Sequence, residues 1–125
     1  MSNLEIYKEH ILDLYKNPSN KGNLENPTHE FVKSNPLCGD EIRIQLIIKN
    51  KKVTNVKFDG EGCAISQASA SLLTDKIKNL SMNEIKKFSK KEILDLLKIP
   101  ISYTRIKCAL LPLDAIKEAL ENAGN

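Results

Sequence analysis

The sequence has no tryptophan, few other aromatic residues and only three cysteines. Aliphatic side chains must therefore fill its core, and 125 residues are enough to bury one without disulfides. An odd number of cysteines, none close to another in the sequence, favours a metal or reactive-thiol site over a disulfide framework. No apolar run approaches the roughly 20 residues of a transmembrane helix, and the first residues show no signal-peptide cleavage site. We expect a cytoplasmic protein without a membrane partner.

The net charge of +3 is small, and lysines are spread along the chain with short clusters at Lys51-Lys52, Lys86-Lys87 and Lys90-Lys91. A nucleic-acid-binding surface usually has a denser basic stripe, with arginines or stacking aromatic residues beside it. We therefore expect no nucleic-acid partner. Basic patches that face an acidic protein partner stay open, because charge steers association.

Hydrophobic periodicity predicts the first half of the chain. Residues 3–16 have the spacing of an amphipathic helix packed on a core, with Tyr15 on its apolar face. Strands are expected at 29–34, 41–50 and 53–58, and Asn50-Lys51 is expected to form a tight turn between the last two. These segments predict a three-stranded antiparallel β-meander.

Helical signals dominate the second half. Residues 64–78 are rich in small side chains, which let a helix approach its neighbours closely. Two capping boxes, Ser81-x-x-Glu84 and Ser89-x-x-Glu92, each mark the start of a helix. Pro112 is expected in the first turn of a last helix. Without internal repeats or linkers, residues 1–125 are expected to form a single α+β domain, a β-meander packed with four to five helices.

The three cysteines share one structural situation. Cys38 lies in a turn before a strand, Cys63 in a glycine-rich loop between a strand and a helix, and Cys108 at the start of the last helix. At such boundaries a side chain can point outward from a rigid frame, and helix N-termini stabilise thiolates. Asp40 is two residues after Cys38 and can reach the same point. Three thiolates and one carboxylate suit tetrahedral zinc or a two-iron cluster.

The mixed donor set favours a labile occupant. Permanent clusters usually have four thiolates, whereas a hard carboxylate exchanges more readily. Simpler interpretations stay open at this point: a free cysteine is often only a small buried apolar residue, and Asp40 could cap a turn or pair with Arg43. From spacing alone the sequence predicts no more than a candidate metal site.

Other polar residues carry weaker signals. His10 on the first helix and His29 beside a loop are more typical of surface histidines than of metal ligands. Lys107 precedes Cys108, and an ammonium group there would favour the attacking thiolate. An ordinary solvated lysine is the equally simple alternative.

Three motifs in order resemble the U-type iron–sulfur cluster scaffolds, the family of IscU, SufU and the N-terminal domain of NifU. The resemblance covers nearly the whole chain and rests on the following residues: Asn35-Pro36-Leu37-Cys38-Gly39-Asp40, Gly60-Glu61-Gly62-Cys63-Ala64-Ile65-Ser66, and Arg105-Ile106-Lys107-Cys108-Ala109. It implies a SufE/NifU-like α+β fold with the cysteines gathered at one exposed end.

The resemblance also implies roles and partners. Cys38, Asp40, Cys63 and Cys108 would bind iron and hold a labile [2Fe-2S] cluster, with zinc as an alternative occupant. Cys108 would accept persulfide sulfur from a cysteine desulfurase, with Lys107 beside it. The cluster would pass to carrier or acceptor proteins, with an iron or electron donor as a further partner. The scaffold, which is not itself an enzyme, would be a monomer or a homodimer that shares the cluster.

Two features separate this chain from each branch of the family. IscU proteins have histidine immediately before the third cysteine, whereas this chain has Lys107, and SufU proteins also have lysine there. However, the 44 residues between Cys63 and Cys108 leave little room for the additional segment that is usual in SufU proteins. The paired prolines of the IscU chaperone-recognition stretch are replaced by residues 99–105. A zinc-dependent sulfurtransferase that relays sulfur, and a purely structural zinc domain, are therefore the alternatives.

Overall fold

The computed structural model describes residues 3–36 and 39–121. Its elements follow in the order α1 (Asn3–Lys16), β1 (His29–Asn35), β2 (Asp40–Lys49), β3 (Lys52–Glu61), α2 (Ala64–Ile77), α3 (Met82–Lys86), α4 (Lys90–Leu97), the 3₁₀ helix η1 (Tyr103–Arg105) and α5 (Ile106–Glu121). The predicted α+β class and antiparallel meander are confirmed, with strand order β1-β2-β3. Among the described residues, no helix is long and apolar enough to span a membrane.

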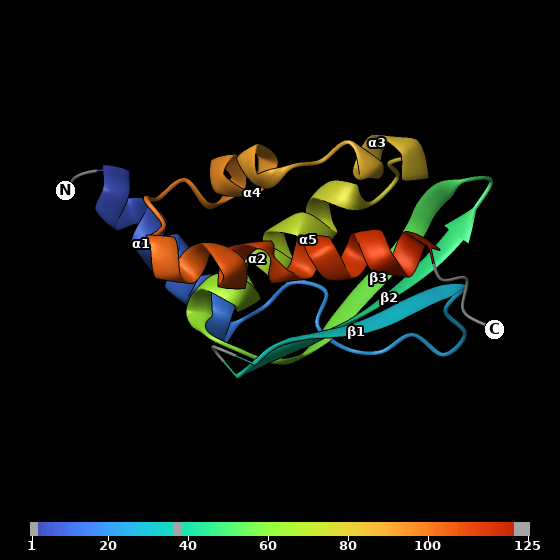
Figure 1. Ribbon diagram of the computed structural model, residues 1–125, viewed down its shortest axis with the longest axis horizontal. Helices are drawn as coiled ribbons and strands as arrows, with labels where there is room; N and C mark the ends of the chain where they lie inside the picture. Colours follow the sequence, from blue (N-terminus) through green and yellow to red (C-terminus); the bar gives the residue numbers. More distant parts are fainter. Residues whose placement is uncertain (1–2, 37–38, 122–125) are drawn as a thin grey trace.

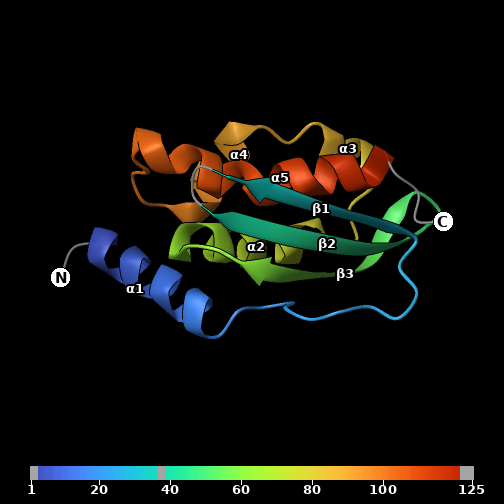
Figure 2. The same ribbon diagram turned by 60° about the horizontal axis from the view of Figure 1, so that its bottom comes forward.

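The elements form layers. Helices α2 and α5 lie side by side over one face of the sheet, and α3 and α4 lie on the far side of these helices (Figure 1). Helix α1 packs beside α2 at one end (Figure 2). Residues 20–22 run along the outer edge of β3, where the Gly22 N–H donates to the Phe58 carbonyl at 2.9 Å. This segment covers an edge that would otherwise expose unpaired backbone groups.

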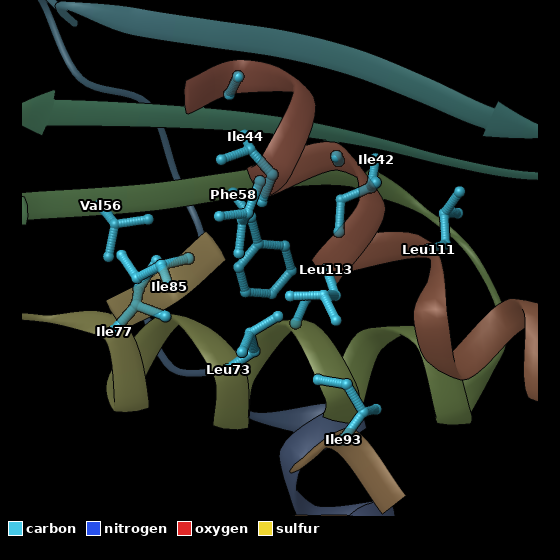
Figure 3. Packing of buried hydrophobic residues seen from close by; sticks show 14 of the residues in the cluster. Ile42, Ile44, Val56, Phe58, Leu73, Ile77, Ile85, Ile93, Leu111 and Leu113 are labelled. Atoms are coloured by element: carbon cyan, nitrogen blue, oxygen red, sulfur yellow. The ribbon is translucent and has the colours of Figure 1, made fainter. Parts of the chain in front are cut away.

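Aliphatic side chains and one phenylalanine fill the space between sheet and helices, as the lack of tryptophan required. Phe58 from β3 lies at the centre, between side chains from β2, α2 and α5 (Figure 3). Alternate residues of β2, from Ile42 to Leu46, point into this core and are fully buried. The period-two pattern of the strand therefore orients Asp40, which shares this buried side, toward the helices.

Small residues bring α2 and α5 into close contact. The Ser69 hydroxyl donates to the Ala109 carbonyl at 2.7 Å, and Ala68 and Ala70 are fully buried. Both predicted capping boxes are present, at Ser81 with Glu84 and at Ser89 with Glu92. The close packing of α2 on α5 fixes the distance between the start of α2 and the start of α5.

Two expectations from the sequence are wrong. Pro112 lies inside α5, because the helix begins at Ile106, and not in its first turn. Proline has no N–H, so it cannot bond to the carbonyl four residues earlier, which belongs to Cys108. Tyr15 is 47% exposed and does not complete the apolar face of α1, on which Ile11 and Leu14 are buried among the side chains that the structure describes.

Candidate metal centre

Asp40 stands at the end of the sheet, as the first residue of β2. It is paired with Asn35, and these two residues flank the β1–β2 connection. Only 3% of Asp40 is exposed. Its Oδ1 accepts a hydrogen bond from the Cys63 N–H at 3.2 Å, whereas its buried Oδ2 has no hydrogen-bond partner among the described residues. A buried polar atom without a partner is costly, so Oδ2 is an available ligand atom.

Cys63 is the N-cap residue of α2, directly after β3 and Gly62. Its side chain makes no capping hydrogen bond, which leaves the sulfur free to point away from the helix end. The Ser66 hydroxyl donates to the Cys63 carbonyl at 3.0 Å and lies 3.9 Å from its Sγ. A helix N-terminus carries partial positive charge, so the sulfur lies where the helix attracts negative charge.

Cys108 is the third residue of α5 and is fully buried. The contact of Ser69 with the neighbouring Ala109 carbonyl holds this turn of α5 against α2. One ligand atom each from Asp40, Cys63 and Cys108 lies within 4.8 Å of the other two. This spacing fits donors around one metal ion, and the carboxylate and thiolate donors are those that zinc and iron accept.

Glycines shape the chain around these donors. A Cβ at Gly62 would lie 2.3 Å from the Ser66 Oγ and 3.1 Å from the Asp40 carboxylate, so a side chain there would displace the donors. Gly60 has a φ of +126°, and a Cβ there would lie 2.2 Å from the Glu41 carbonyl oxygen. Only glycine fits where two backbones approach so closely.

Arg105 is a site residue that the sequence analysis did not single out. It ends η1 and hydrogen-bonds to the sulfurs of Cys63 and Cys108. The pKa of Arg105 is raised above its ordinary value. The largest cause is electrostatic attraction to Cys63, followed by the hydrogen bonds to the two sulfurs and by attraction to Cys108. The guanidinium places a fixed positive charge beside the two sulfurs. Its place three residues before Cys108, one helical turn away, was the available signal.

An open hollow adjoins two of the three donors. It has a volume of about 750 Å³ and adjoins Asp40 and Cys63. Among its walls are Tyr15 and Lys21, and the Lys21 ammonium donates to the side-chain oxygen of Gln67 at 3.5 Å. The exposure of Tyr15, unexpected from its helical spacing, results from its position at this hollow.

The other candidates are placed as follows. Cys38 lies outside the described residues. Lys107 is exposed on α5. His10 is exposed, and the Thr28 hydroxyl contacts the His29 ring at 2.9 Å, so neither histidine joins the donors. Arg43 pairs with Asp59 at 3.7 Å and not with Asp40.

The family model described as the NifU-like N terminal domain matches residues 6–123. The chain belongs to this family. It is 38% identical to the zinc-dependent sulfurtransferase SufU of Bacillus subtilis, over 96% of this chain and 94% of that protein. It is 33% identical to the iron–sulfur cluster assembly scaffold protein IscU of Escherichia coli K12, over 91% of each chain.

Solved structures of the family share the fold. A crystal structure of a SufU from Fervidobacterium islandicum, described as a putative iron–sulfur cluster assembly scaffold, superposes with a TM-score of 0.79 at 30% identity. That match covers 95% of this chain and 99% of the other. The alignment with the B. subtilis protein extends over 139 positions, more than the 125 residues of this chain, so that relative has residues that this chain lacks.

Proposed function

We propose that this protein is a scaffold for iron–sulfur cluster assembly. It binds iron, accepts persulfide sulfur from a cysteine desulfurase, assembles a labile [2Fe-2S] cluster and transfers it to acceptor proteins. In this role the cluster is cargo and the scaffold is not an enzyme. We propose that residues 1–125 act as one domain in the cytoplasm, as a monomer or as a homodimer that shares a cluster.

The observation that carries this proposal is the donor set at the end of the sheet. Two thiols and a buried carboxylate converge within 4.8 Å, and one carboxylate oxygen lacks a partner among the described residues. Cys38, two residues before Asp40 in the sequence, is the fourth proposed ligand. A hard carboxylate among soft thiolates makes a cluster site that exchanges its occupant.

The chemistry requires partners besides the desulfurase. The Cys108 thiolate attacks the outer sulfur of the desulfurase persulfide, the sulfur–sulfur bond breaks, and the desulfurase thiolate leaves and takes up a proton. The transferred sulfur is formally neutral, so its conversion to sulfide consumes two electrons. An electron donor and an iron source are therefore part of the proposal, together with the acceptor protein.

A zinc-dependent sulfurtransferase is the second candidate. The relative from B. subtilis carries that name, and Lys107 with the Gly60-Glu61-Gly62-Cys63 loop resembles the SufU branch. In that role Cys38, Asp40, Cys63 and Cys108 bind zinc, and Cys108 passes sulfur to an external acceptor. The shorter interval between Cys63 and Cys108 favours the scaffold.

Metal content distinguishes the two candidates. After anaerobic purification, a scaffold is expected to be brown, to absorb in the visible and to contain iron and sulfide. A colourless protein that keeps one zinc ion after iron reconstitution would favour the sulfurtransferase. The reconstitution step matters because zinc acquired during expression would otherwise hide an iron site.

Arg105→Gln is expected to weaken zinc binding by about tenfold, as removal of a group that supports metal ligands commonly does. Zinc with three thiolates and a carboxylate has a net negative charge, which the guanidinium offsets. Competition with a chromophoric chelator measures the affinity, and Arg43→Gln, at the chain's other arginine, is the control. Equal affinities of the Arg105 variant and the unmodified protein would contradict this role.

A further inference from the structure

We propose that a lysine-rich edge, separate from the metal centre, is a docking surface for a protein that presents clustered carboxylates. The edge runs from the β2–β3 turn over α3 to the start of α4 (Figures 1 and 2). Its members come from three separate stretches of sequence: Lys49, Lys51, Lys52, Lys86, Lys87, Lys90 and Lys91. All are exposed.

Backbone contacts fix the first two stretches against each other. The Met82 N–H at the start of α3 donates to the Lys51 carbonyl at 2.9 Å, and Lys52 forms an isolated bridge with Ser81. Only two residues connect the end of α3 at Lys86 with Ser89, the N-cap of α4. The fold therefore gathers lysines that are up to about 40 residues apart in the sequence.

The acidic residues in these stretches, Glu84 and Glu92, have hydrogen-bond partners of their own, and Glu92 also attracts Lys91. Glu84 accepts a hydrogen bond from the Ser81 N–H, and Glu92 accepts one from the Ser89 N–H and one from its hydroxyl, so each is held at a helix N-terminus. The described ion pairs join Lys33 with Glu118, Arg43 with Asp59 and Lys78 with Asp75. None of the edge lysines is in an ion pair among the residues that the structure describes.

The backbone conformation and the strand pairing at the β2–β3 turn are unfavourable for lysine. Asn50 and Lys51 have φ values of +54° and +65°, a two-residue turn in which glycine is preferred at the second position. Lys49 and Lys52 are paired directly across the strands, where like charges repel. A sequence selected for stability alone would replace Lys51, and departures from local preference mark functional surfaces.

The surroundings of the lysines point to an acidic protein. Neither arginine of the chain lies on this edge, and none of the exposed large apolar side chains belongs to it. RNA recognition usually adds arginines or stacking aromatic residues, and membrane-binding surfaces add apolar ones. Carboxylates complement compact lysine ammonium groups without either addition.

The β2–β3 turn of the edge lies at the opposite end of strand β2 from the metal centre. Strand β2 begins at Asp40, a proposed metal ligand, and ends at Lys49 on the edge. Ten residues of strand extend about 30 Å. A partner on this turn therefore leaves the hollow beside Asp40 and Cys63 open to a second protein, which goes beyond the proposed assembly function.

Binding of a fluorescein-labelled octaglutamate peptide to the full chain, measured by anisotropy at low ionic strength, tests the proposal. The double variant Lys86→Glu/Lys87→Glu is expected to weaken binding by about tenfold. The control, Lys8→Glu/Lys16→Glu, makes the same change in net charge at exposed positions of α1, and it is expected to weaken binding by less than about twofold. Equal losses in both variants would show that only net charge matters and would overturn the proposal. Tighter binding of an octauridine RNA or of phosphatidylserine vesicles would overturn it as well.

Lys51→Gly separates binding from folding. Glycine relieves the positive φ, so the melting temperature is expected to rise by about 4 °C. Peptide binding is expected to weaken by about threefold, because one ammonium group is lost. A variant that melts higher but binds as tightly as the unmodified chain would contradict a docking role for this turn.

Discussion

Cys108→Ser is expected to abolish the acceptance of persulfide sulfur from a cysteine desulfurase. Serine is nearly the same size as cysteine, so α5 and its contact with Ser69 should persist, whereas the hydroxyl is not a nucleophile toward a persulfide. Mass spectrometry of the protein after incubation with desulfurase and cysteine would detect the added sulfur. Circular dichroism would show that the variant is folded.

The burial of Cys108 adds a requirement to this prediction. The side chain is fully buried, and Arg105 at the end of η1 contacts its sulfur. Because the fold covers this sulfur, partner binding has to expose it before sulfur can move, so partner binding and sulfur transfer should be coupled. Cys63→Ser is the matched control, and it should still gain sulfur at Cys108. Unchanged sulfur uptake by Cys108→Ser would assign the acceptor role to another cysteine.

Asp40→Ala is expected to slow the release of an assembled cluster to an acceptor protein by about tenfold. The carboxylate is the hardest and most exchangeable of the proposed ligands, so its loss leaves only thiolates, which an acceptor thiolate displaces more slowly. Stopped-flow absorbance after mixing with an apo-ferredoxin would measure the transfer. Asp59→Ala is the control, because Asp59 pairs with Arg43 on the neighbouring strand.

Faster cluster transfer by Asp40→Ala would assign a different role to the carboxylate. Asp40 Oδ1 also accepts the Cys63 N–H, so alanine could loosen the loop before α2 as well as remove a ligand. Faster transfer by Asp40→Ala than by the unmodified protein would show that Asp40 retains the cluster and does not release it. The carboxylate would then be a holding ligand, contrary to the exchange role proposed for it.

Local signals in the sequence predicted most of the fold. The period-two pattern of β2, the helical spacing of α1 and the capping boxes at Ser81 and Ser89 each depend on residues close in the sequence, and each is confirmed. The turn at Asn50-Lys51 is also present, with both residues at positive φ. Interactions between residues close in the sequence were sufficient to predict these elements.

The errors came where tertiary contacts override local preference. Proline usually begins a helix, but burial of Pro112 against the core stabilises it inside α5. Tyr15 has the spacing of a core residue, yet it lies at the hollow beside Asp40 and Cys63. Neither outcome could be predicted from helical spacing alone.

The sequence indicated Asp40, Cys63 and Cys108 as candidate donors but did not predict how the fold brings them together. Long sequence intervals separate Asp40, Cys63 and Cys108, and only the packing of α2 on α5 at the end of the sheet brings them together. Arg105 was not predicted as a site residue, because its position three residues before Cys108 does not by itself establish a contact with the sulfurs. Its contact with two sulfurs is visible only in three dimensions.

Anaerobic reconstitution with iron, cysteine and a desulfurase, followed by transfer to an apo-ferredoxin, tests the central proposal most directly. Ultraviolet–visible and Mössbauer spectra should show a two-iron cluster on the chain, and the same spectra should then show it on the ferredoxin. A protein that holds no iron, but raises desulfurase turnover only when zinc is bound, would contradict the scaffold and establish a sulfur carrier.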